Sequence, residues 1–112
     1  MKRIDAIIRP NNLEAVKDHL VTLGIEGLTI SEVRGFGRQR GHTEICRGTE
    51  YSVDLVPKIM ITILVTEERV TAILDAITAG ARTGKMGDGK ILVTPLEEVV
   101  RIRNGDRGDS AI

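Results

Sequence analysis

Two glycine-rich segments of the chain carry residues that could bind an anion. Residues 34–58, RGFGRQRGHTEICRGTEYSVDLVPK, hold four glycines among many charges, and residues 82–90 read RTGKMGDGK. Glycine lets backbone N–H groups approach a phosphate closely, and Lys90, Arg101 and Arg103 add positive charge. If the strands that carry these groups end near each other, the groups can converge on one polyphosphate. The alternative for each glycine is a tight turn.

Both segments come close to known phosphate-loop motifs without matching them. Residues 84–91 fit GxxxxGK, but Ile91 stands where a Walker A loop needs Ser or Thr for magnesium. This segment also runs from a predicted helix to a predicted strand, the reverse of a P-loop. Residues 35–41 are one residue too long for GxGxxG and begin no helix. The sequence therefore disfavours a Walker ATPase and a Rossmann dehydrogenase.

The residue types most used in catalysis do not form a known constellation. His19 lies on a predicted helix, while His42 and Cys46 lie in the first glycine-rich segment without an acid or metal ligand at a useful spacing. We expect both histidines to be solvated. About twenty residues of that segment have no hydrophobic period, and loops of this length in small domains are usually functional or disordered.

The composition predicts one domain and disfavours nucleic acid as a partner. The 112 residues include 16 basic and 16 acidic ones, and aromatic residues make up 2%. A neutral chain lacks the basic surplus that neutralises nucleic-acid phosphates, and few rings are present to stack on bases. A single Cys excludes an internal disulfide, and no apolar run is long enough to span a membrane. We expect a soluble, cytoplasmic protein.

Hydrophobic periodicity predicts the elements that position these segments. Apolar residues alternate in the strands and recur at helical spacing in the helices. The predicted strands are 3–9, 28–36, 59–65 and 91–93, and the predicted helices are about 12–23 and about 66–80. The order βαββαβ is that of a ferredoxin-like α+β sandwich, in which both helices cover one face of a four-stranded sheet.

The predicted strand 59–65 differs from the others because it is apolar on both faces. It reads IMITILV, and a strand of this kind is covered on both sides. Two short helices can cover only one face of the sheet. We therefore predict that the open face packs against other copies of the chain, with a merely hydrophobic strand on a monomer as the alternative.

The segment after Pro95 is short and ends in a polar tail. Val99–Arg103 alternates in character, so Arg101 and Arg103 share one face if the segment is extended. Residues 104–112 are polar and rich in Gly, which predicts a mobile tail.

Five stretches together resemble the PII nitrogen-regulatory signal proteins over essentially the whole chain. They are residues 6–10 (AIIRP), 27–39 (GLTISEVRGFGRQ), 47–51 (RGTEY), 81–90 (ARTGKMGDGK) and 100–103 (VRIR). The resemblance implies a single domain over 1–112 that assembles as a homotrimer of ferredoxin-like subunits. It also implies a T-loop at about 37–56, a B-loop at about 82–90 and a C-terminal loop at about 102–112.

The resemblance further implies three clefts between subunits that bind ATP or ADP in competition, with Mg²⁺ and 2-oxoglutarate joining ATP. The residues implied for adenosine are Ile7, Thr29, Gly35, Gly37 and Leu64. Those implied for the phosphates are Arg38, Gly87, Asp88, Gly89, Lys90, Arg101 and Arg103. Gln39 is implied for magnesium, and Arg9, Gln39, Gly41, Lys58 and Gly87 for 2-oxoglutarate.

By the same resemblance the protein is a non-enzymatic sensor that acts on targets through the T-loop. Tyr51 stands where many relatives are uridylylated, and Thr49 where some carry a phosphorylated Ser. The implied partners are an ammonium transporter, regulators of glutamine synthetase and N-acetylglutamate kinase, with the membrane reached only through a transporter.

Two other functions remain open, and three positions depart from the expected family pattern. The alternatives are a weak ATPase in the same cleft and a nucleic-acid module on the same fold. The departures are Asn11–Asn12 for an aromatic–Lys pair, Cys46 for a Tyr, and Thr62 for a Glu near the adenosine pocket.

Overall fold

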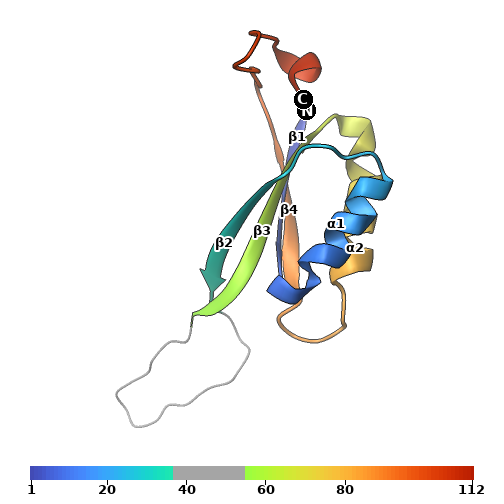
Figure 1. Ribbon diagram of the computed structural model, residues 1–112, viewed down its shortest axis with the longest axis vertical. Helices are drawn as coiled ribbons and strands as arrows, with labels where there is room; N and C mark the ends of the chain where they lie inside the picture. The colour runs from blue at the N-terminus through green and yellow to red at the C-terminus, as the bar shows by residue number, and fades with distance from the viewer. Residues whose placement is uncertain (37–54) are drawn as a thin grey trace.

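The computed structural model describes residues 1–36 and 55–112 and has two layers, a four-stranded antiparallel sheet and two helices on one of its faces (Figure 1). The strands and helices are β1 (Lys2–Ile8), α1 (Leu13–Thr22), β2 (Thr29–Gly35), β3 (Val56–Val65), α2 (Val70–Ala81) and β4 (Gly89–Pro95). Short 3₁₀ turns occupy Pro10–Asn12, Glu67–Arg69 and Gly108–Ala111. The sheet order β2-β3-β1-β4 confirms the predicted ferredoxin-like βαββαβ fold.

The hydrophobic core lies between the sheet and the helices, as the alternation in the sequence predicts. Ile4, Ala6 and Ile8 on β1 are buried, and their odd-numbered neighbours face the other way. The rest of the core comes from β3, the two helices and the turn after α1: Val16, Leu20, Ile25, Ile61, Ile63, Val65, Ile73, Ile77 and Ala81. Among the described residues, no helix is long and apolar enough to cross a membrane.

The two helices cross closely at Gly80. A Cβ built on Gly80 would lie 2.9 Å from the backbone of Val16, nearer than side chains approach in real structures. Any larger residue would therefore push α2 away from α1 and open the core.

The opposite face of the sheet is not covered by any described helix. Strand register places Ile7, Met60 and Leu64 on this open face, where all three are half-buried. The polar residues Asp5, Thr62 and Thr29 lie beside them in one row across β1, β3 and β2. The double-sided apolar character of β3 is thus real, while the expected packing against other copies stays a prediction.

The C-terminal segment corrects the prediction made for it. Val99–Arg103 is not a strand, because only Val100 forms a bridge, with Arg107, and the chain turns immediately afterwards. The Arg101 N–H donates to the Asp106 carbonyl at 2.9 Å, and the Gly105 N–H donates to the Arg101 carbonyl at 2.8 Å. This folded loop lies beyond the C-terminal end of β4, at the opposite end of the molecule from residues 82–88 (Figure 1).

Candidate ligand-binding site

The strand register brings two cations together where β1 ends. Ile8 pairs with Ile59, so Lys58 is the first β3 residue beyond the last β1 pair, and Arg9 follows Ile8 directly. Lys58 pairs instead with Val33 on β2 and shares the open face with Met60. Arg9 and Lys58 therefore lie at one level, at the end of the sheet where the β2–β3 ribbon continues alone (Figure 1).

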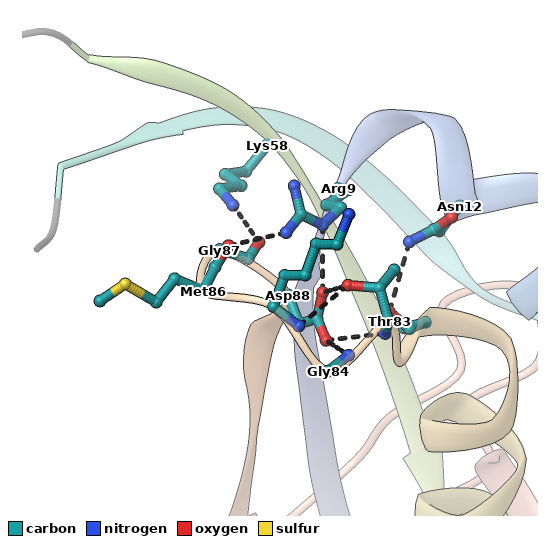
Figure 2. A network of polar contacts seen from close by, with 10 residues as sticks. Arg9, Asn12, Lys58, Thr83, Gly84, Met86, Gly87 and Asp88 are labelled. Atoms are coloured by element: carbon teal, nitrogen blue, oxygen red, sulfur yellow. Dashed lines mark hydrogen bonds and ion pairs between the residues drawn. The ribbon is translucent and has the colours of Figure 1, made fainter. Parts of the chain in front are cut away.

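The loop of residues 82–88 folds onto both cations (Figure 2). Lys58 Nζ donates to the Gly87 carbonyl at 2.5 Å, and Arg9 Nη2 donates to the Met86 carbonyl at 2.7 Å. Arg9 Nε donates to Asp88 Oδ1 at 3.1 Å and forms an ion pair with it. Desolvation, and secondly the nearby Arg9 charge, lower the pKa of Lys58 below its usual value. We call this region, formed by Arg9, Lys58 and residues 82–90, the loop end.

Asp88 organises the loop. Its carboxylate accepts hydrogen bonds from the N–H of Thr83 at 2.7 Å and of Gly84 at 2.8 Å, and from the Thr83 hydroxyl. Together with Arg9, these donors hold the pKa of Asp88 far below its usual range. Because these donors occupy both carboxylate oxygens, Asp88 positions the loop, and its side chain is not free to bind a ligand.

Gly89 is required by packing. A Cβ at this position would lie 1.8 Å from the Ile7 carbonyl oxygen, and the φ of Gly89 is +103°. Because β4 begins at Gly89, this glycine lets the strand meet β1 and places Lys90 opposite Ile7 on the open face. At least one glycine of the second segment, Gly89, is therefore required by the packing of β4 against β1.

A pocket of about 580 Å³ lies at the other end of the open face. Its lining combines Thr29, Thr62 and Leu64 with the turn between α1 and β2 and with the C-terminal residues Asp109, Ala111 and Ile112. Arg101 donates to the Ile112 carbonyl and to Asp106 at 3.5 Å each, which ties the C-terminal loop together. We call this region, the pocket with the C-terminal loop, the pocket end.

The residues predicted from the sequence divide between these two regions. Six of them lie at the loop end: Arg9, Lys58, Gly87, Asp88, Gly89 and Lys90. Gly35 on β2 lies beside Lys58. Thr29 and Leu64 line the pocket, Arg101 and Arg103 belong to its C-terminal loop, and Ile7 lies on the open face between the two ends. Gly37, Arg38, Gln39, Gly41, Thr49 and Tyr51 lie outside the described residues, as do Cys46 and most of the predicted T-loop.

One expected convergence does not occur within a single chain. Arg101 and Arg103 were predicted to meet the same phosphates as Gly87–Lys90, yet β4 separates the two groups. A seven-residue strand is about 23 Å long. The prediction also assumed that residues 99–103 form an extended segment with Arg101 and Arg103 on one face. The chain turns after Val100, so this segment is not extended.

Several structurally important contacts were not predicted from the sequence. Thr83 supplies two of the donors to Asp88, and Asn12 Nδ2 donates to the Ala81 carbonyl at 3.3 Å, linking the start of α1 to the end of α2. Asp5 accepts a hydrogen bond from Thr62 across the open face. Thr83 and Asp88 are five positions apart around two glycines, a pattern typical of a closed turn. Asp5 and Thr62 had no such signal. Among residues 1–36 and 55–112, no three His, Cys, Asp or Glu side chains gather into a metal site.

Fold and site together define a small ferredoxin-like domain with a polar candidate site at one end of its open face. A family model described as "Nitrogen regulatory protein P-II" matches residues 1–106, so the chain belongs to the P-II family of nitrogen regulatory proteins. Proteins of that name from Azospirillum brasilense and Pasteurella multocida are each 53% identical over 112 residues, covering all of both chains. The crystal structure of Arabidopsis thaliana PII bound to citrate superposes with a TM-score of 0.81 at 37% identity, covering 99% of this chain and 91% of that one. This family is regulatory and acts on target proteins.

Proposed function

We propose that this protein senses nitrogen, carbon and energy status without catalysing a reaction. It binds ATP or ADP, binds 2-oxoglutarate when Mg-ATP is present, and regulates nitrogen-metabolism proteins through residues 37–56. The observation that carries the proposal is the loop end, where two cations and a glycine-rich loop form a polar site that suits an anionic ligand. Family membership gives the regulatory role its context.

The separation of the two ends supports a nucleotide cleft shared between copies. Lys90 lies at the loop end, whereas Arg101 and Arg103 lie in the C-terminal loop beyond the other end of β4. The loop end of one copy can meet the pocket end of another without any change of fold. A cyclic homotrimer would contain three such clefts, with adenosine in the pocket and the phosphates between Lys90 and the two arginines. The half-buried apolar residues of the open face supply a surface for this assembly.

The cation pair supports 2-oxoglutarate as the second ligand. Arg9 presents a planar fork that suits a carboxylate, and Lys58 presents a compact charge beside it. Besides the Arg9–Asp88 ion pair, their acceptors are two backbone carbonyls of the loop, which a carboxylate can replace with a stronger, charge-assisted hydrogen bond. The similar Arabidopsis protein was crystallised with citrate, itself a polycarboxylate.

The Lys58 contact suggests how the two ligands are coupled. A carboxylate that takes the Lys58 ammonium releases the Gly87 carbonyl, and Gly87 belongs to the loop proposed to hold phosphate. Magnesium on ATP would supply coordination positions for the keto acid, with Gln39 beside it. Because binding free energies are reciprocal, ATP and 2-oxoglutarate would each raise the affinity of the other. A tenfold effect corresponds to about 1.4 kcal/mol, within reach of one charge-assisted contact.

The targets proposed are an ammonium transporter, regulators of glutamine synthetase, and N-acetylglutamate kinase. Tyr51 is proposed as a uridylylation site and Thr49 as a phosphorylation site. Precipitation of partners from lysate with ATP, ADP, or ATP plus 2-oxoglutarate tests the target set, because a ligand-controlled partner changes between these conditions.

Calorimetry tests the proposed sensing function. We expect Mg-ATP to bind the purified protein, and 2-oxoglutarate to bind at least tenfold more tightly when Mg-ATP is present. Equal binding of 2-oxoglutarate with and without ATP contradicts the proposed order. Steady-state ATP hydrolysis that depends on Lys58 and Gln39 would favour a small ATPase.

A further inference from the structure

At the pocket end, one hydroxyl on β3 has its orientation fixed by a carboxylate. Thr62 Oγ1 donates to Asp5 Oδ1 at 2.6 Å, and the two residues are register partners on β3 and β1. On its other side Thr62 is the register partner of Thr29 on β2, and both threonines line the pocket. Thr62 therefore stands between Asp5 and the pocket.

The chemistry of this pair determines what Thr62 can offer to a ligand. A threonine hydroxyl has a single proton to donate and two lone pairs, while a carboxylate accepts hydrogen bonds and donates none. The hydrogen bond between them must therefore use the hydroxyl proton. Arg3 Nε contacts the same carboxylate at 3.0 Å, and the Asp5 side chain is only 17% exposed, which keeps the carboxylate in place. The Thr62 oxygen is left with acceptor capacity alone.

We propose that Asp5 is a positioning residue that makes Thr62 a hydrogen-bond acceptor for an O–H or N–H group of the ligand in this pocket. The inference rests on the proposed nucleotide binding and adds a specificity element to it. Two parts of an adenine nucleotide carry such a donor, the ribose hydroxyls and the amino group of the base. A ligand that lacks the recognised donor leaves the oriented oxygen without its partner, and this reduces affinity.

The test compares ATP with 2′-deoxyATP, 3′-deoxyATP and purine riboside triphosphate in calorimetric titrations of the intact protein. The wild-type protein should prefer ATP over one of these analogues by about fivefold to tenfold, and the analogue that loses affinity identifies the donor. In Thr62→Val this preference should fall to about one, because the side chain keeps its branched shape but loses the oxygen. Thr62→Ser should retain the preference.

Two further variants separate positioning from general damage. Asp5→Ala should reduce the preference for ATP even if it also weakens ATP binding, because the Thr62 hydroxyl is then no longer held as an acceptor and the ligand must order it. Thr94→Val is the matched control, since Thr94 lies on the same open face opposite Arg3 but outside the pocket lining. It should keep the full preference.

The outcomes distinguish this inference from the proposed function. A wild-type protein that binds no ATP contradicts nucleotide sensing itself. A wild-type protein that binds ATP and all three analogues equally, or a Thr62→Val variant that keeps the wild-type preference, overturns the inference while leaving nucleotide sensing intact. An Asp5→Ala variant with undiminished preference removes Asp5 from its positioning role.

Discussion

The loop end and the pocket end lie on the same open face of the sheet, yet they meet a ligand in opposite ways. At the loop end the charged groups already bind one another, and the Arg9–Asp88 pair joins positions 79 residues apart in the sequence. At the pocket end there is open space of about 580 Å³ with a single oriented hydroxyl on β3. Under the proposed function, a ligand would have to displace protein contacts at the loop end, whereas it would fill existing space at the pocket end.

This difference indicates a division of roles. Displacement at the loop end lets a ligand move residues 82–88, so this is the region where binding can be converted into a change of conformation. A preformed pocket mainly sets which ligand binds and how tightly.

The largest expected effect comes from removing the glycine on which the loop end is built. Gly89→Ala places a Cβ against the Ile7 carbonyl and should lower the free energy of unfolding by about 3 kcal/mol or more. Gly84→Ala is the matched control, because Gly84 also has a positive φ of +88° but no atom within 4 Å of the added Cβ. It should cost about 1 kcal/mol.

Urea unfolding at one protein concentration measures both glycine variants. Equal stability of the two would show that close packing of β4 on β1 does not support the loop end.

The second effect concerns the cation that the loop already uses. Lys58→Met keeps most of the unbranched side chain but removes the charge, and should weaken 2-oxoglutarate binding by about tenfold to a hundredfold. Lys85→Met, in the loop of residues 82–88, is the control, because Lys85 is exposed and no ion pair of its ammonium is found among the described residues. Calorimetry with saturating Mg-ATP measures both. Equal losses of 2-oxoglutarate affinity in the two variants would show that Lys58 acts only through its contribution to the overall charge.

A smaller effect should appear in acid, where the loop end loses its organising carboxylate. The pKa of Asp88 is lower in the folded than in the unfolded protein, so its stabilising contribution is present above the unfolded value of about 4 and is lost as the pH falls through the folded value. Asp88→Asn should therefore be less stable than the wild type at neutral pH, and the difference should shrink below about pH 4. Thermal unfolding across this pH range measures the stability difference between the two proteins. A difference that stays constant with pH would contradict a stabilising role for the ionised Asp88 carboxylate.

The smallest effect is expected in alkali. Burial and Arg9 lower the pKa of Lys58, and a carboxylate ligand prefers the protonated ammonium. The affinity for 2-oxoglutarate should thus be constant near neutral pH and fall as the pH rises through the pKa of Lys58. Because this pKa is lowered, the fall should begin at a lower pH than for an ordinary lysine, whose pKa is about 10.4. Titrations from about pH 7 to about pH 10 measure this. An affinity that rises with pH would exclude Lys58 as the ammonium partner.

The sequence predicted features that depend on a local pattern of residues. It did not predict features that depend on turns or on contacts between distant segments. The alternation of Ile4, Ala6 and Ile8 predicted the buried face of β1, and the order of periodic segments predicted the fold. Strand β4 is longer than predicted because it begins at a glycine and ends at a proline, residues that strand propensity disfavours.

The site was predicted in part. Arg9, Lys58 and Gly87, which the resemblance grouped, lie together in the structure, while their binding of 2-oxoglutarate stays a prediction. Arg101 and Lys90 do not meet within one chain, because they lie beyond opposite ends of β4, and their meeting across two copies stays a prediction. The Asp5–Thr62 contact depends on the register of β1 against β3, which no local pattern specifies.

The central claim is that one copy supplies the loop end of each nucleotide cleft and a neighbouring copy supplies the pocket end. The most direct test mixes two variants, Lys90→Ala and Arg103→Ala, unfolds and refolds them together, and measures ATP binding by calorimetry. Each variant alone should bind ATP weakly. The mixture should restore full affinity in about one quarter of the clefts, those with Lys90 from one variant and Arg103 from the other. A mixture that binds no better than its two components contradicts the shared cleft.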